Sequence, residues 1–416
     1  MFAGVPQGSV LGPLLFLVFI NDIVADIHCN IRLFADDTSL YAIIEDPQTS
    51  TNHLNSDLEL ISNWAKTWKV NFNPNKTESI LFSRKRVLSP MPDLFLNNVK
   101  IQIVNAHKHL GLTLQSDCQW QSHINELFSK VSPMINCLRS LKYRLNRNSL
   151  QTLYSSYILP LFDYCDFIWD NCTKNQEFIL EKLHLDALRT ICGAVRGVSH
   201  SKIYQETGYS SLNERRQIHK MKLFHKMYHH KTPQYLTDPI PPRTSDVSAY
   251  STRSCNTLQS PLCRTELYKK SFLPSSVRDW NVLDDPMRNI ESSSLFSKIY
   301  DKSACNVHRI FRNYGTRKNQ ILHCKLRLCC SDLNGHKFDN HIHDTSLCSC
   351  GYIYEGNVHF LFHCPNFSNI RSNSYFYVKG FNLNTVLYGS NDLPHDVNIE
   401  IIESVHNFLT LCKRFQ

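Results

Sequence analysis

Residues 31–41, Ile-Arg-Leu-Phe-Ala-Asp-Asp-Thr-Ser-Leu-Tyr, place two neighbouring aspartates between two short apolar runs. The runs predict strands over 31–34 and 39–44, joined by a turn that carries Asp36 and Asp37. A tight turn can direct neighbouring carboxylates toward one point, whereas side chains alternate in direction along a straight strand. An isolated Asp-Asp pair is most often a plain polar turn, so its meaning depends on the surrounding sequence.

A second segment lies upstream, where residues 4–13 read Gly-Val-Pro-Gln-Gly-Ser-Val-Leu-Gly-Pro. After the break at Pro13, residues 14–23 are apolar nearly all round, which predicts a helix that is fully buried. We expect Phe34 and Tyr41 to anchor the predicted hairpin from its apolar side.

The hydrophobic pattern of the remaining chain predicts an α+β protein in four parts: 1–115, 116–232, 233–300 and 301–416. The first part is mixed, with an amphipathic helix over 54–65 and strands over 80–82 and 99–103. The second part is helical, with helices over 124–138 (kinked at Pro133), 149–161 (capped by Ser149), 178–191 and 214–229. Pro, Ser and Thr in the third part predict a linker and a poorly defined segment, and the fourth ends in a Cys/His cluster.

The composition fits a globular protein of roughly two or three domains. The chain has 416 residues, 42% of them hydrophobic, and a formal net charge of +9 that suits a partner carrying phosphates. Most of the 16 cysteines stand singly among apolar neighbours, as Cys137 does, which favours a reducing compartment over a disulfide framework. The apolar stretch 10–20 is too short for a membrane span and has no basic flank before it. We therefore expect an intracellular protein, in nucleus and cytoplasm, with no membrane partner.

Together, the two segments resemble the second half of the active site of reverse transcriptases from non-LTR (LINE-like) retrotransposons related to the jockey group. The run Phe-Ala-Asp-Asp at 34–37 resembles that family's signature box, which implies that Asp36, and less centrally Asp37, are catalytic ligands of Mg²⁺. Residues 4–13 resemble the family's conserved loop and helix start. There Gln7 and Gly8 would approach the template and the incoming deoxynucleotide.

The resemblance continues through 64–77 and 109–112. It makes Lys76 a candidate proton donor to the departing pyrophosphate, the alternative being a solvated loop lysine. His-Leu-Gly-Leu at 109–112 resembles the hairpin that steadies the primer end, with Gly111 close to the substrate. The alternative is a buried strand with a glycine kink.

The family's polymerases need a further aspartate, on a strand several dozen residues before the segment at 4–13. Three residues precede Gly4 in this chain, and Asp22 and Asp26 lie in the wrong topological position to replace that carboxylate. The resemblance therefore makes residues 1–115 a partial palm, truncated before the first catalytic aspartate motif. We expect this chain, as given, to be inactive or incomplete.

In the family a helical thumb follows the palm and holds the template-primer duplex, and residues 116–232 occupy that position. Arg215, Lys222 and Lys226 are candidate phosphate contacts, which would position a duplex without reading its bases. The same cations could instead form an ordinary solvated helix face.

The C-terminal cluster has the spacing Cys-x-Cys-x₈-His-x₄-Cys, formed by Cys348, Cys350, His359 and Cys364. Three thiolates and one imidazole are a closed tetrahedral set for a structural Zn²⁺. His363 competes with His359 as the nitrogen ligand, but it is the direct neighbour of Cys364, so the spacing favours His359. The cluster resembles the family's zinc knuckle, although its single-residue gap between the first two cysteines is narrower than usual. Free buried cysteines are the alternative.

The leading hypothesis is an RNA-directed DNA polymerase domain of a non-LTR retrotransposon, present as an inactive or incomplete fragment. Its partners would be an RNA template, a DNA primer and deoxynucleotides, with Mg²⁺ and a structural Zn²⁺ as cofactors. The alternative is a non-catalytic nucleic-acid-binding remnant of a retroelement.

Overall fold

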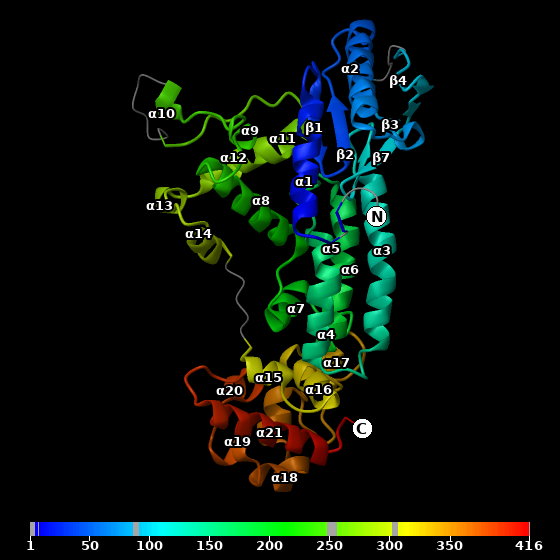
Figure 1. Ribbon diagram of the computed structural model, residues 1–416. Helices are drawn as coiled ribbons and strands as arrows, with labels where there is room; N and C mark the ends of the chain where they lie inside the picture. The colour runs from blue at the N-terminus through cyan, green and yellow to red at the C-terminus, as the bar shows by residue number, and fades with distance from the viewer. Residues whose placement is uncertain (1–4, 7, 86–90, 248–255, 302–306, 416) are drawn as a thin grey trace. The chain divides into compact units, whose positions relative to one another are not determined.

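The computed structural model describes residues 5–6, 8–85, 91–247, 256–301 and 307–415. The chain divides after His123 into two units: unit 1, residues 1–123, and unit 2, residues 124–416 (Figure 1). Short strands occur with helices in unit 1, and unit 2 is built from helices, which confirms the mixed helix-and-sheet class. Gln7 lies outside the described residues.

Unit 1 contains small paired strands and two α-helices. The helices are α1 (Leu11–Ile20) and α2 (Pro47–Trp68), with 3₁₀ turns η1 (Asn21–Val24) and η2 (Pro74–Lys76). The antiparallel pairs are β1 (Asn30–Phe34) with β2 (Asp37–Tyr41), β4 (Phe95–Leu96) with β5 (Val99–Lys100), and β7 (Ala106–His109) with β8 (Leu112–Gln115). The parallel pair is β3 (Glu78–Ser79) with β6 (Gln102–Ile103).

Two predictions about the first helix were wrong. It begins at Leu11 rather than after Pro13, because a proline in the first helical turn removes only an N–H that needs no intrahelical acceptor. It is also not fully buried: Leu14 is 58% exposed and Val18 70%, while Ile20 is buried. The sequence of a helix that is apolar on every side does not indicate which face packs against the core. The pattern therefore could not show that most of α1 is exposed to solvent.

The core of unit 1 joins α1, the first hairpin and α2. Ile20, Ile23 and Ile61 are buried there, and Ile31 and Leu33 pack against them. The predicted helix over 54–65 is confirmed, but it is longer. It begins after Asp46, whose side chain accepts the N–H of Thr49 at 2.8 Å.

The later strands of unit 1 differ from the pattern prediction. Residues 80–82 are not a strand; the strand lies two residues earlier, at 78–79. The predicted strand 99–103 is split between β5 and β6, and Ile101 is buried while Ile103 is 52% exposed. Runs of two paired residues are too short for alternation to specify their position.

Unit 2 begins within α3 (Gln121–Ser140), which contains Pro133, and continues as a series of helices. They are α4 (Arg147–Leu153), the π-helix η3 (Tyr154–Ile158), α5 (Leu159–Asp163), α6 (Lys174–Cys192), α7 (His200–Thr207) and α8 (Leu212–Tyr228). The predicted cap Ser149 was wrong by three residues: Asn146 is the N-cap, and its side chain accepts the N–H of Ser149 at 2.8 Å.

The segment 233–300, predicted as a linker and a poorly defined segment, carries short helices in its described residues. Residues 256–301 form several of these short helices. Two of their side chains, Trp280 and Phe296, pack in one core with Met221 and Phe224 of α8. The helices between 233 and 301 are α9 (Gln234–Thr237), α10 (Thr244–Val247), α11 (Glu266–Lys270), α12 (Phe272–Val282), α13 (Asp285–Arg288) and α14 (Ser293–Tyr300). Composition missed them because Ser and Pro here cap and start short helices.

The C-terminal part of unit 2 has its own apolar core, in which Phe360, Phe376 and Phe408 meet (Figure 1, yellow to red). Its helices are α15 (Arg309–Asn313), α16 (Arg317–Arg327), α17 (Asn334–Asp339), the π-helix η4 (His359–His363), the 3₁₀ turn η5 (Pro365–Phe367), α18 (Ser368–Ser372), α19 (Tyr375–Val378), α20 (Leu383–Tyr388) and α21 (His395–Leu411).

A buried ion triad ties this part to the rest of unit 2. Glu206 of α7 accepts from Arg147 at 2.6 Å and from Arg327 at 2.6 and 2.8 Å, and all three side chains are at most 2% exposed. Burial opposes ionisation of Glu206, but the two guanidinium groups outweigh it and lower the pKa of this carboxyl to about 2. The triad therefore joins α4, α7 and α16 through charge.

Candidate catalytic hairpin and metal centre

The hairpin that carries the aspartates is closed by a two-residue turn. Phe34 pairs with Asp37 across β1 and β2, so the turn consists of Ala35 and Asp36. Ala35 has φ 51°, a left-handed conformation that tight hairpin turns use. The structure therefore confirms two strands around the aspartates, but the predicted bounds of the second strand, 39–44, were wrong. β2 begins at Asp37 and ends at Tyr41, so only Asp36 of the two aspartates lies in the turn.

The hairpin presents its polar tip outward and packs through its alternate residues. Ile31, Leu33 and Leu40 contact the core of unit 1, and both aspartates are exposed. The expectation that Phe34 and Tyr41 anchor the hairpin was wrong, since they are 64% and 46% exposed. Residues on one face of a strand share burial, and that face begins with Ile31.

Asp57, which the sequence reasoning missed, fixes the chain just before β1. It lies in α2, is 0% exposed, and accepts the backbone N–H groups of His28 and Cys29 at 3.1 and 2.7 Å. Burial opposes its ionisation, but these hydrogen bonds hold the pKa of Asp57 below its usual range. Its signal in the sequence was a carboxylate on the same helical face as Leu54 and Ile61.

Asp22 connects η1 to two tryptophans of α2. One of its oxygens accepts from Trp64 Nε1 at 2.8 Å and the other from Trp68 Nε1 at 3.1 Å. Phe19 packs edge-on against both indoles. Both oxygens of Asp22 are therefore engaged in holding the two tryptophans of α2.

Gly8, in the segment 4–13, has a backbone conformation that favours glycine. Gly8 has φ 86°, and a Cβ placed there would meet no atom within 4 Å. The N–H of Gly12 is bound by Ser9 Oγ at 3.2 Å at the start of α1. The backbone near Gly8 is therefore open to close approach by a ligand.

The other two predicted residues of unit 1 lie in a turn and a hairpin. Lys76 ends η2 and is exposed, and it forms no ion pair with either aspartate among the described residues. Gly111, with φ 84°, forms the turn between β7 and β8 together with Leu110. A hairpin at 109–112 is thus present rather than a single kinked strand.

The basic residues of α8 are largely engaged inside unit 2. Arg215 binds Asp163 through two nitrogens at 2.9 and 2.5 Å, and Lys222 lies 3.7 Å from Asp301. Of the three predicted phosphate contacts, Lys226 is exposed and has no carboxylate partner in the part of the chain that the structure describes. The sequence could not show this, because the carboxylates come from distant segments.

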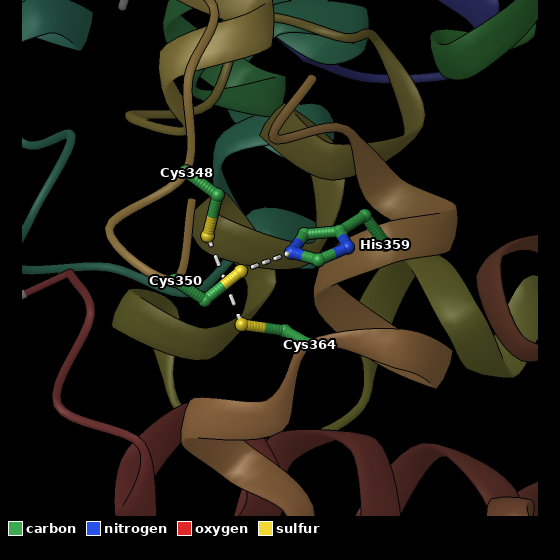
Figure 2. Close-up of side chains that lie close together, drawn as sticks. All are labelled: Cys348, Cys350, His359 and Cys364. Carbon is green, nitrogen blue, oxygen red and sulfur yellow. Dashed lines mark hydrogen bonds between the residues drawn. The ribbon is translucent and has the colours of Figure 1, made fainter. Parts of the chain in front are cut away.

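The four predicted zinc ligands converge in one cluster. One ligand atom each from Cys348, Cys350, His359 and Cys364 lies within 4.8 Å of the others. The Sγ atoms of Cys348 and Cys364 are 3.7 Å apart, and Cys350 Sγ lies 3.2 Å from His359 Nε2 (Figure 2). Zn–S bonds of about 2.3 Å in a tetrahedron would separate two sulfurs by about 3.8 Å, so these side chains fit the ion.

Short local elements bring the four ligands together. Cys348 and Cys350 lie on a turn in which Gly351 has φ 91°, and its N–H donates to the carbonyl of Cys348 at 2.9 Å. His359 opens η4, and Cys364 follows its last residue. The single-residue gap between the first two cysteines is therefore compatible with convergence.

Burial shapes the protonation of these ligands. It raises the pKa of the Cys364 thiol to about 12 and also raises that of Cys348, so thiolates at these positions need a nearby cation. Burial lowers the pKa of His359, which keeps the imidazole neutral, as a metal ligand must be. His363 is exposed and outside the cluster, and Cys329 and Cys330 are not part of it either.

A surrounding layer of side chains, not predicted from the sequence, holds the ligands. The Tyr352 ring stacks on His359, with ring centroids 4.3 Å apart and planes 3° from parallel. Arg371, which is buried, donates to the carbonyls of Cys364 and of Phe362. No spacing rule marks such residues, since they act through stacking and backbone contacts.

Comparison with known proteins finds a family model that matches the segment containing the hairpin. Residues 1–124 match the family model described as reverse transcriptase (RNA-dependent DNA polymerase). Residues 1–124 are therefore similar to reverse transcriptases, and the relatives below are polymerases of mobile elements. That segment includes both the hairpin of β1 and β2 and the hairpin of β7 and β8.

Three of the similar proteins are polymerases of mobile elements of Drosophila melanogaster. The chain is 28% identical over 203 residues to the RNA-directed DNA polymerase from mobile element jockey, a match that covers 46% of this chain and 22% of that protein. It is 22% identical over 237 residues to the probable RNA-directed DNA polymerase from transposon X-element (55% and 26%), and 26% identical over 248 residues to that from transposon BS (55% and 27%). The chain thus spans about a quarter of the length of these relatives. None of its described helices is both long and apolar enough to cross a membrane.

Proposed function

We propose that unit 1 forms part of the active site of an RNA-directed DNA polymerase, as a partial palm, and that Asp36 and Asp37 are its Mg²⁺ ligands. The observation that carries the proposal is the hairpin itself: a two-residue turn exposes adjacent carboxylates within a segment that matches reverse transcriptases. Carboxylate oxygens are the ligands that Mg²⁺ prefers. When bound, such ions stabilise the charge that develops on the reacting phosphate oxygens.

The carboxylate set in unit 1 is incomplete in this proposal. No third Asp, Glu, His or Cys of the described residues joins Asp36 and Asp37 in a candidate metal cluster. Lys76, Gly8 and Gly111 would serve the departing pyrophosphate, the nucleotide and the primer end. This proposal predicts that the 416-residue chain does not extend primers on its own, and that a longer protein supplying the further carboxylate does.

Primer extension on an RNA template with Mg²⁺ and deoxynucleotides tests the proposal. The chain should give no product above background, and a fusion with an upstream polymerase segment of a relative should give product. In the fusion, Asp36→Asn should lower the rate by about 10³-fold, the effect expected when a charge-stabilising group at the reacting centre is lost. Asp26→Asn, an exposed carboxylate in the same unit, is the matched control. Product from the unfused chain, or equal rates for the two variants, would refute the assignment.

The Cys/His cluster supports a structural zinc knuckle in unit 2. All four ligand positions of a tetrahedral ion would be filled, which leaves no open position for substrate. The free cysteines of the described residues suit a reducing, intracellular location in nucleus and cytoplasm. Metal analysis of purified protein tests the zinc assignment, and about one equivalent per chain is expected.

A second candidate function is binding of an RNA–DNA duplex without catalysis, with residues 116–232 as a thumb. Exposed Lys226 and the net charge of +9 favour it. Duplex retention should fall as salt rises, and Lys226→Ala should reduce the salt slope by about 1. Retention that does not change with salt would argue against both functions.

A further inference from the structure

Three carboxylates, from the last residue of α5 and the segment that follows it, contact residues of α8. Asp163 binds Arg215 through two nitrogens, and Asp170 lies 3.1 Å from Arg216 Nε. Asp170 is also 3.3 Å from the ammonium group of Lys220. The first and last of the three, Asp163 and Asp170, are therefore matched by full positive charges.

The middle carboxylate, Asp166, is not matched in this way. It is 1% exposed, and one oxygen accepts from His219 Nδ1 at 2.7 Å. Its other oxygen, Oδ1, is buried and has no hydrogen-bond partner among the described residues. Burial raises the pKa of Asp166, although the hydrogen bond to His219 acts in the opposite direction. A buried carboxylate oxygen of this kind costs free energy unless a proton or a cation reaches it.

The surroundings of Asp166 supply the remaining ligands for a cation. One ligand atom each from Asp163, Asp166 and His219 lies within 4.8 Å of the others. A cation bound by His219 Nδ1 would replace the proton that this nitrogen shares with Asp166. Asp163 can keep its bonds to Arg215 and still contribute, since a carboxylate has about four lone-pair sites. His219 and Arg215 also line a cavity of about 60 Å³, which has room for water on the side of His219 and is not lined by Asp163 or Asp166.

We infer that Asp163, Asp166 and His219 form a site for a divalent transition metal such as Mn²⁺, with water in its remaining positions. Mixed oxygen and imidazole ligands suit such ions, whereas the thiolates of the Cys/His cluster select zinc. The site lies where α5 meets α8. The ion would neutralise Asp166, the one of the three carboxylates that has no guanidinium or ammonium partner. It is independent of the polymerase proposal, which concerns unit 1.

Mn²⁺ titration of the full, zinc-loaded chain, followed by electron paramagnetic resonance, tests the inference. Asp166→Asn and His219→Gln should each lose about one bound Mn²⁺ relative to the unchanged chain, with circular dichroism confirming the fold. Any Mn²⁺ held by Asp36 and Asp37 should remain in both variants. His230→Gln, which changes an exposed histidine just beyond α8, is the matched control and should retain the full count.

A second readout needs no variant to fold. Pulsed measurements on the unchanged chain should show coupling between Mn²⁺ and an imidazole nitrogen. Absence of that coupling in the folded chain would overturn the inference and leave a proton as the group that neutralises Asp166. An unchanged Mn²⁺ count in both variants would overturn it as well.

Discussion

The hairpin of unit 1 and the Cys/His cluster of unit 2 are both proposed metal sites, but they differ in the number and burial of the ligands that they offer. The hairpin offers two exposed carboxylates on one turn, with no third candidate ligand in the described residues. The cluster gathers four ligands within seventeen consecutive positions, 348 to 364, and buries most of them. This difference shows that one local segment can supply every ligand of a tetrahedral metal site, whereas one two-residue turn supplies only two carboxylates.

Loss of one thiolate from the Cys/His cluster should give the largest effect. Cys364→Ser should reduce bound zinc from about one equivalent to near zero and lower the melting temperature of unit 2, because metal binding free energy is also folding free energy. Metal analysis and thermal unfolding measure the two effects. Cys137→Ser, an exposed cysteine outside the cluster, should change neither; equal zinc content in both variants would contradict closure of the site.

A change in the buried triad of Glu206, Arg147 and Arg327 tests whether the stability of unit 2 depends on buried charge, whereas the aspartates of the hairpin are exposed. Glu206→Gln leaves Arg147 and Arg327 buried without their carboxylate, so the free energy of unfolding should fall by about 3–5 kcal/mol. Urea unfolding measures this, with Glu266→Gln, an exposed carboxylate, as the control.

The pKa of Glu206 is lowered to about 2 in the folded chain. The difference between unchanged chain and variant should therefore be complete above about pH 4.5 and shrink as the pH falls toward 2. A pH-independent difference would show that the carboxylate charge is not the cause.

The stacked ring beside the cluster should have a smaller effect. Tyr352→Ala removes the aromatic surface that orients His359 but no ligand, so zinc affinity should fall by about tenfold, as for other supporting residues around metals. Competition with a chelator measures it. Tyr143→Ala, at a tyrosine that is 75% exposed, is the control, and an unchanged affinity in Tyr352→Ala would remove the ring from the site.

The smallest expected effect is on the stability of the hairpin. Asp36→Asn should change the free energy of unfolding of unit 1 by no more than about 0.5 kcal/mol, because the side chain is exposed. Denaturant unfolding followed by tryptophan fluorescence measures it. A large loss of stability would mean that the aspartate has a structural role and would weaken the contrast between the two sites.

Local signals in the sequence predicted the hairpin around the aspartates and the convergence of the four Cys/His side chains. The two strands around Asp36 follow from their flanking apolar runs, and the cysteine spacing chose His359 over His363. Long-range partners were not predictable in the same way. The carboxylates that bind Arg215 and Arg216 come from Asp163 and Asp170, which lie some fifty positions away. Nor could an evenly apolar pattern indicate that most of α1 would be exposed.

The carboxylate of Asp22, held between the indole N–H groups of Trp64 and Trp68, gives unit 1 an optical property of its own. The chain has five tryptophans, and Trp169 and Trp280 are buried in unit 2. Trp64 and Trp68 share one acceptor, so the emission of both should change together when the contact between η1 and α2 breaks. Asn in place of Asp22 would then identify that part of the fluorescence signal and allow the two units to be followed separately in a single unfolding curve.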